Sequence, residues 1–165
     1  MSSHKIILKV NGQNYPLEIE ASRTLVEVLR DELGLTGTKN SCDRGDCGSC
    51  TVLIDDKATK SCLVLAVEVE GKEITTVEGL SKDARLSAVQ RAFIERGAIQ
   101  CGFCTPAFVI AGEGLLRRNP NPTEQEAREA IEGILCRCTG YRQIIDAILH
   151  ASLATKAQQA DVPRS

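Results

Sequence analysis

Short apolar runs separated by polar residues dominate the first half of the chain. Four of these runs are predicted to be β-strands: 5–10, 15–20, 51–54 and 72–77. The first two flank Asn11-Gly12, a dipeptide typical of a two-residue hairpin turn. Residues 24–33 instead carry apolar side chains at helical spacing and end at Gly34, which predicts a helix. Strands around one helix predict a small α+β domain, residues 1–78.

The second half has apolar residues at helical spacing throughout. Four helices are predicted: 87–96, 105–118, 123–135 and 141–153. Pro106 suits the first turn of the second helix, and Thr123 with Glu126 forms a capping box for the third. Four short helices with short connections predict an all-α four-helix bundle, residues 79–155, followed by a flexible polar tail, residues 156–165.

A long loop, residues 36–50, interrupts the first domain. It is rich in Gly, Ser and Asp and contains three cysteines. Long loops without secondary structure in a compact domain are usually functional. We therefore expect the chemistry of the first domain to lie in this loop.

Charge and hydropathy exclude several classes of protein. The 165 residues include 20 Lys and Arg against 22 Asp and Glu, a formal net charge of −2, so no nucleic-acid partner is expected. No apolar run approaches the roughly 20 residues of a membrane-spanning helix. The first residues lack the pattern of a secretory signal. We therefore expect a cytoplasmic protein, in a compartment where structural disulfides are uncommon.

Eight cysteines are the unusual feature of the composition, and they divide into four per predicted domain. The first quartet reads C-x4-C-x2-C-x11-C and consists of Cys42, Cys47, Cys50 and Cys62. The spacing of its first three members matches that of plant-type ferredoxins, which hold one 2Fe–2S cluster. Gly45 and Gly48 alternate with these cysteines, and glycine permits positive φ angles and close approach of the backbone.

The second quartet combines a C-x2-C pair with a C-x-C pair. Its members are Cys101, Cys104, Cys136 and Cys138. Each pair directly precedes a predicted helix. Two helix N-termini are therefore expected to face one anionic centre, because their free N–H groups and positive dipole ends favour negative charge. This arrangement indicates one four-thiolate site.

Other uses of the cysteines fit the sequence less well. Four disulfides are typical of shorter, secreted chains. Four-cysteine zinc sites usually have two C-x2–4-C pairs, and the first quartet is not paired in this way. His4 and His150 lie at opposite ends of the chain without a partner motif. The sequence contains no motif for nucleophilic, phosphate or hydride chemistry, so we expect this chain to move electrons and to transform no substrate itself.

Three segments resemble motifs of one known family. Residues 42–52 resemble the plant-type cluster loop of the molybdenum hydroxylase, or xanthine oxidase, family, and residues 100–106 and 135–141 are similar to its second cluster motif. The resemblance covers roughly residues 4–153. It implies the small iron–sulfur subunit of an oxidoreductase, similar to those of carbon monoxide dehydrogenase and 4-hydroxybenzoyl-CoA reductase.

The resemblance also implies a β-grasp, ferredoxin-like first domain and two 2Fe–2S clusters bound by the eight cysteines. A large subunit would hold a molybdenum–pterin cofactor and a medium subunit FAD, in a dimer of heterotrimers. Cys138 and Gln100 would approach the pterin, and the first quartet would face FAD or an external acceptor. The alternative is a free-standing soluble electron carrier, although such a carrier needs only one of the two domains.

Overall fold

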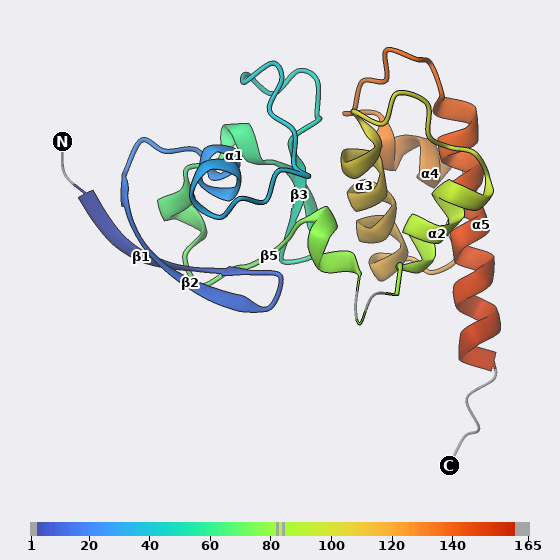
Figure 1. The fold of residues 1–165 in the computed structure, drawn as a ribbon. Helices are drawn as coiled ribbons and strands as arrows, with labels where there is room; N and C mark the ends of the chain where they lie inside the picture. Colours follow the sequence, from blue (N-terminus) through green and yellow to red (C-terminus); the bar gives the residue numbers. More distant parts are fainter. Residues whose placement is uncertain (1–2, 82, 84, 161–165) are drawn as a thin grey trace.

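The computed structural model describes residues 3–81, 83 and 85–160, with side chains described up to residue 154. A sheet with a short helical segment forms one side of the molecule, and four helices form the other (Figure 1). This arrangement confirms the predicted fold class, an α+β first half followed by a helical second half.

The sheet has five strands in the order β2-β1-β5-β3-β4. The strands are β1 (Ser3–Val10), β2 (Gln13–Glu20), β3 (Thr51–Ile54), β4 (Lys57–Lys60) and β5 (Glu73–Thr75). β1 and β5 run parallel, and the other neighbouring strands are antiparallel. Asn11 and Gly12 form the predicted hairpin turn, both with positive φ angles.

The predicted first helix lies against the sheet as α1 (Leu25–Glu27), which continues into a π-helical turn, η1 (Val28–Glu32). Its start is fixed by Thr24, whose N–H and hydroxyl donate to the Glu27 carboxylate at 2.7 and 2.8 Å. Leu25, Val28 and Leu29 are fully buried in the core of the sheet. The predicted residues therefore form a helix here, but only its first turn is α-helical.

The pattern of apolar residues did not predict β4. Its sequence, Lys57–Lys60, has no alternation of apolar and polar residues because this short strand lies at one edge of the sheet and buries none of its side chains fully. Asp55 and Asp56, with φ angles of 48° and 62°, connect it to β3 by a two-residue turn.

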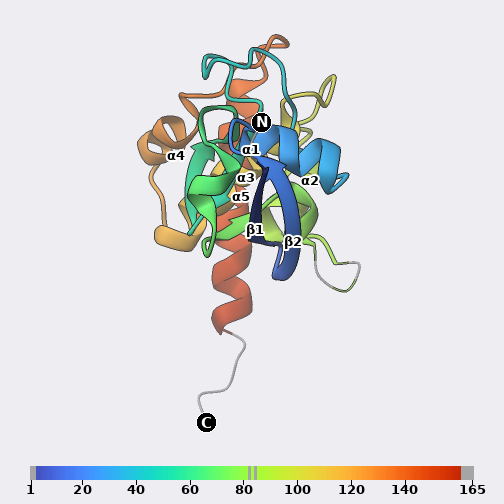
Figure 2. The same cartoon turned by 90° about the vertical axis from the view of Figure 1, so that its left-hand side faces the viewer.

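The second half contains α2 (Ala88–Glu95), α3 (Thr105–Arg118), α4 (Glu124–Ile131) and α5 (Tyr141–Ala160). The predicted end of the third helix is wrong, because a turn that includes Gly133 follows Ile131. The last helix is longer than predicted and continues to Ala160, within the expected tail 156–165. Residues 161–165 lie outside the described residues. In Figures 1 and 2, α5 extends past the other helices at the end opposite the loops.

Three short 3-10 helices complete the described elements: η2 (Ser61–Leu63), η3 (Ala66–Val69) and η4 (Val77–Leu80). The first follows β4 and carries Cys62. The last leads from β5 toward the helical half.

Strand β3 belongs to the cores of both halves. Val52 and Ile54 are buried in the core of the sheet, whereas Leu53 points the other way and is fully buried in the core of the helices. Gly114 of α3 leaves room for Leu53, since a Cβ at position 114 would lie 2.7 Å from Leu53 Cδ2. The two halves are therefore packed together through a shared apolar strand.

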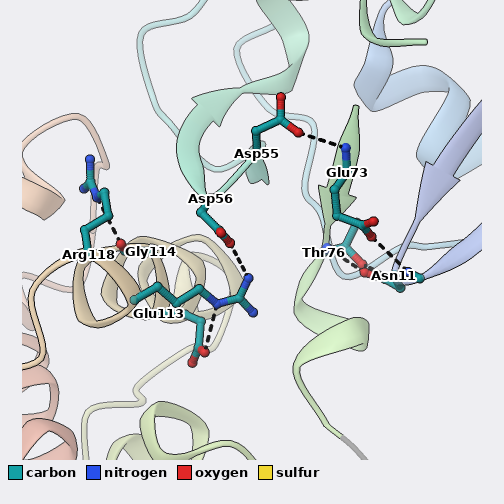
Figure 3. A network of polar contacts seen from close by, with 10 residues as sticks. Asn11, Asp55, Asp56, Glu73, Thr76, Glu113, Gly114 and Arg118 are labelled. Carbon is teal, nitrogen blue, oxygen red and sulfur yellow. Dashed lines mark hydrogen bonds and ion pairs between the residues drawn. The ribbon is translucent and has the colours of Figure 1, made fainter. Parts of the chain in front are cut away.

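Polar contacts surround this apolar interface. Asp56 in the β3–β4 turn accepts a hydrogen bond at 2.6 Å from the guanidinium of Arg117, which also pairs with Glu113 in the preceding turn of α3. Figure 3 shows Asp56 directed at α3, while Asp55 accepts from the Glu73 N–H in β5 at 3.0 Å. The turn thus connects the sheet to the helices.

Candidate metal centres

Three loops that hold cysteines lie at the same end of the molecule. They are the loop 36–50 and the connections that precede α3 and α5 (Figures 1 and 2). Only Cys62 comes from a regular element, η2. All eight thiols are free of disulfides.

The first quartet divides into two pairs of thiols. The Cys47 N–H donates to the Cys42 sulfur at 3.3 Å, and the Cys47 sulfur lies 3.2 Å from the Ser49 hydroxyl oxygen. Cys50 and Cys62 form the second pair, in one buried cluster. Both are buried against Val26 of α1, which keeps water from this side of the site.

Backbone and burial move the pKa values of this quartet in opposite directions. Backbone N–H groups, chiefly those of Cys47 and Arg44, lower the pKa of Cys42 to about 6. Burial raises the pKa of Cys62 to about 11, helped by the neighbouring Cys50. The loop thus favours the thiolate form of Cys42, whereas the buried Cys62 thiol would lose its proton only when a cation binds.

The two glycines of this loop lie where no side chain fits. Gly45 has φ +83°, and a Cβ there would lie 2.5 Å from Leu63 Cδ1. Gly48 has φ +69°, and a Cβ there would overlap the carbonyl of Gly133 from the helical half. The loop therefore turns tightly at both positions and lies in contact with the α4–α5 connection.

A lysine that sequence reasoning missed also holds this loop. The Lys60 ammonium at the end of β4 donates to the Gly45 carbonyl at 2.7 Å. Gly45 lies between Cys42 and Cys47 in the sequence, so this hydrogen bond holds a positive charge at the loop that carries both cysteines. A lysine in a polar strand gives no sequence signal of this role.

The second quartet lies between the starts of α3 and α5, as predicted. All four of its cysteines line one small hollow. The Gly140 N–H adds a donor to the Cys136 sulfur at 3.5 Å. Burial raises the pKa of Cys104 to about 12, whereas the Phe103 N–H lowers that of Cys101.

Gln100 lies beside this quartet. Its side-chain nitrogen would be 3.2 Å from a Cβ at position 140, so Gly140 leaves room for it. Gln100, Cys101 and Cys138 line one small hollow at the surface. The sequence-predicted residues are thus brought together here, with Gln100 and Cys101 exposed to solvent.

Each half supplies four free thiols, the number that a 2Fe–2S cluster takes as ligands. The donor set therefore fits two clusters, one per quartet.

One backbone hydrogen bond joins the two cysteine loops. The Leu135 N–H donates to the Cys47 carbonyl at 2.9 Å. The acceptor, Cys47, belongs to the first quartet. The donor, Leu135, directly precedes Cys136 of the second quartet. The sequence motifs contain both segments but do not reveal that they touch.

Tyr141 is a second residue near the site that sequence reasoning did not single out. Its hydroxyl accepts a hydrogen bond from the Cys136 N–H at 2.8 Å. The signal in the sequence was its place three residues after Cys138 and five after Cys136, at the start of a helix. Neighbouring Thr139 has φ +58°, a strained value for a β-branched residue.

Known families match both halves of the chain. Residues 8–84 match the 2Fe-2S iron-sulfur cluster binding domain, and residues 76–149 match the 2Fe-2S binding domain. Within the described residues, no helix is long and apolar enough to cross a membrane.

Several characterised proteins are similar over most of their length. The nicotine 6-hydroxylase small subunit of Paenarthrobacter nicotinovorans is 47% identical over 147 residues, which is 89% of this chain and 88% of that subunit. Caffeine dehydrogenase subunit gamma of Pseudomonas sp. strain CBB1 is 44% identical over 164 residues, 98% of each chain. A chain of quinoline 2-oxidoreductase from Pseudomonas putida 86 superimposes with a TM-score of 0.89 at 45% identity, covering 97% of this chain and 99% of that one.

These similarities show that the chain is an iron–sulfur subunit of an oxidoreductase. The chain belongs to the small iron–sulfur subunits of the xanthine oxidase family of molybdenum hydroxylases. The family expected from the sequence motifs is thereby confirmed.

Proposed function

We propose that the chain relays electrons between partner subunits of a molybdenum hydroxylase, with one 2Fe–2S cluster in each cysteine quartet. The observation that carries this proposal is the placement of two quartets of free thiols, one in each half, in loops and helix starts at the same end of the molecule. In the proposed ligand sets, Cys42, Cys47, Cys50 and Cys62 hold one cluster, and Cys101, Cys104, Cys136 and Cys138 hold the other. A bound 2Fe–2S cluster supplies a one-electron carrier.

The chain's own residues hold, insulate and connect the two centres. Backbone N–H groups in the loop 36–50 stabilise negative charge on sulfur, as the lowered pKa of Cys42 indicates. Val26 keeps water from the buried Cys50–Cys62 side. The Leu135 N–H and the Cys47 carbonyl provide a hydrogen-bonded link between the loops.

Partner subunits are expected to cover the exposed side of the second quartet. Gln100 and Cys101 are exposed, and Phe103 and Leu135, which are 49% and 60% exposed, line one hollow together with Cys101; exposed apolar side chains grouped in this way mark interaction sites. We propose that a large subunit with a molybdenum–pterin cofactor binds here and that Cys138 and Gln100 approach the pterin. The first quartet would then face a medium subunit that holds FAD.

We further propose a dimer of such heterotrimers in the cytoplasm. The similar proteins are named as small or gamma subunits, which supports an assembly of several chains. The eight free thiols suit a reducing compartment. The names of three similar proteins refer to nicotine, caffeine and quinoline, so nitrogen heterocycles are the first substrate class to test in the complex.

The experiment is to purify the chain with the subunits encoded beside it and to determine their masses and cofactors by native mass spectrometry. Anaerobic addition of a substrate should then bleach the visible absorption of the clusters. A chain that elutes alone and accepts electrons directly from soluble donors would instead support the free-standing carrier.

A further inference from the structure

The ring of Tyr141 is fixed between two helices. Tyr141 is the first residue of α5, and its ring packs edge-on against Phe108 of α3, with centroids 6.0 Å apart and planes at 87°. Phe108 is fully buried. Because aromatic rings packed in this way have little freedom, the hydroxyl of Tyr141 has a defined position.

This hydroxyl contacts the backbone on both sides of Leu135. It accepts from the Cys136 N–H at 2.8 Å and donates to the Ile134 carbonyl at 3.4 Å. The Leu135 side chain is 60% exposed, so packing of that side chain does not hold the residue. Leu135 is held instead by the hydrogen bonds that the Tyr141 hydroxyl makes with the backbone on both sides of it.

The carbonyl of Ile134 and the N–H of Leu135 belong to one peptide group. A trans peptide is planar, and its carbonyl and N–H point in opposite directions; no described bond is cis. The carbonyl is directed at Tyr141, and the N–H is directed at the Cys47 carbonyl at 2.9 Å. Fixing one end of the peptide therefore orients the other, and donation to the carbonyl also strengthens the N–H as a donor.

We propose that Tyr141 is a positioning residue for electron transfer between the two centres. Its hydroxyl orients the Ile134–Leu135 peptide toward Cys47 and fixes the backbone of Cys136. The inference rests on the proposed function, because that function makes Cys47 and Cys136 ligands of different clusters. It adds a residue that binds neither cluster but sets the contact between their loops.

The test compares Tyr141→Phe with Tyr15→Phe in the purified complex. Tyr141→Phe removes the hydroxyl and keeps the ring that packs on Phe108. Tyr15→Phe is the matched control, since its hydroxyl donates to Gln13 at 2.8 Å at an exposed position in the hairpin. Two measurements are made on each variant: hydrogen exchange of the peptide that contains Leu135, followed by mass spectrometry, and electron paramagnetic resonance of the reduced clusters with rapid-freeze transfer kinetics.

Tyr141→Phe removes both hydrogen bonds of the hydroxyl and should speed exchange at Leu135 about two- to tenfold, the effect of losing the one neutral bond to the Leu135 peptide group. It should also slow transfer between the clusters and change the spectrum of the cluster in the helical half, with the iron content unchanged. Tyr15→Phe should change none of these. Unchanged exchange, spectrum and transfer rate in Tyr141→Phe would overturn the inference, and so would loss of iron or of the fold, since Tyr141 would then serve folding.

These outcomes are separable from failure of the proposed function. If the unmodified complex lacks two distinct 2Fe–2S signals, the proposed function fails. If it has both signals and Tyr141→Phe leaves them and the exchange at Leu135 unchanged, only the role of Tyr141 fails.

Discussion

The Leu135 N–H donates to the Cys47 carbonyl at 2.9 Å and joins the two cysteine loops through a single peptide contact. Beside it, Gly48 lies against the carbonyl of Gly133, so the loops touch at neighbouring positions of each half. The shared strand β3 also joins the two halves, because Leu53 packs among the helices. The relative position of the two proposed clusters therefore depends on packing between the halves.

Gly48→Ala should separate the loops. It adds a methyl group that overlaps the Gly133 carbonyl, at a φ of +69°. Gly12→Ala is the matched control, with φ +79° and no atom within 4 Å of the added Cβ. We expect Gly48→Ala to lower the free energy of unfolding by about 1–3 kcal/mol more than Gly12→Ala, as measured by anaerobic urea unfolding. Equal losses in the two variants would mean that the loops are not in contact.

Leu53→Ala should weaken both halves at once. Leu53 is fully buried among the helices although it lies in the sheet. Removing its side chain should cost about 2–5 kcal/mol of unfolding free energy. Leu153→Ala, at a 60% exposed position of α5, is the control and should change stability little. If urea unfolding gave the same midpoint for both variants, β3 would not connect the two cores.

Lys60→Gln should lower the reduction potential of the cluster in the first quartet. The Lys60 ammonium donates to the Gly45 carbonyl within the loop, and a nearby positive charge favours the more negative, reduced cluster. Lys57→Gln removes the same charge at an exposed position of the same strand. Potentiometric titration followed by electron paramagnetic resonance should therefore give a lower midpoint in Lys60→Gln alone. An equal shift in both variants would assign the effect to general charge.

Removal of iron should leave the Cys42 thiol more reactive than the Cys62 thiol. With a pKa of about 6, it carries about ten thiolates for each thiol at pH 7, whereas Cys62, with a pKa of about 11, remains protonated. Brief alkylation of the chelated protein at pH 7, followed by peptide mass spectrometry, should therefore label Cys42 before Cys62. Labelling of Cys42 should fall as the pH drops below 6.

The lowered pKa of Cys42 also determines how the stability of the iron-free fold changes with pH. Because the folded state lowers the pKa of Cys42 from 9.0, its contribution is fully present above pH 9 and is lost as the pH falls through about 6. Cys62 acts in the opposite sense and destabilises the iron-free fold as the pH rises from 9 toward 11. Uniform labelling of both thiols, with a common midpoint near pH 8.5, would contradict the assigned environments.

Local patterns predicted much of this fold. Asn11-Gly12 gave the hairpin because a two-residue turn is set by its own residues. The cysteine spacings predicted that the first quartet lies at a loop and the second at two helix starts, because these positions are also set by neighbouring residues. Patterns were weaker at ends of elements: Gly133 ends α4 before residue 135, and the edge strand β4 has no apolar alternation.

Several individual contacts could not be predicted, because they depend on which residues the complete fold brings together. Leu53 looks like an ordinary strand residue, yet it is buried in the other half. Tyr141 looks like part of a helix start, yet its hydroxyl holds the backbone at Cys136. Lys60 looks like a solvent-exposed lysine, yet it bonds Gly45. In each case the side chain's role comes from a partner distant in the sequence or on another element.

The most direct test of the two-cluster account is iron and acid-labile sulfide analysis together with spin quantitation of the fully reduced protein. The account predicts about four iron and four sulfide per chain, and two distinct spin signals of equal intensity. Cys138→Ser should alter the signal of the helical half first. Zinc in place of iron, about two iron per chain with a single signal, or loss of only the other signal in Cys138→Ser would contradict it.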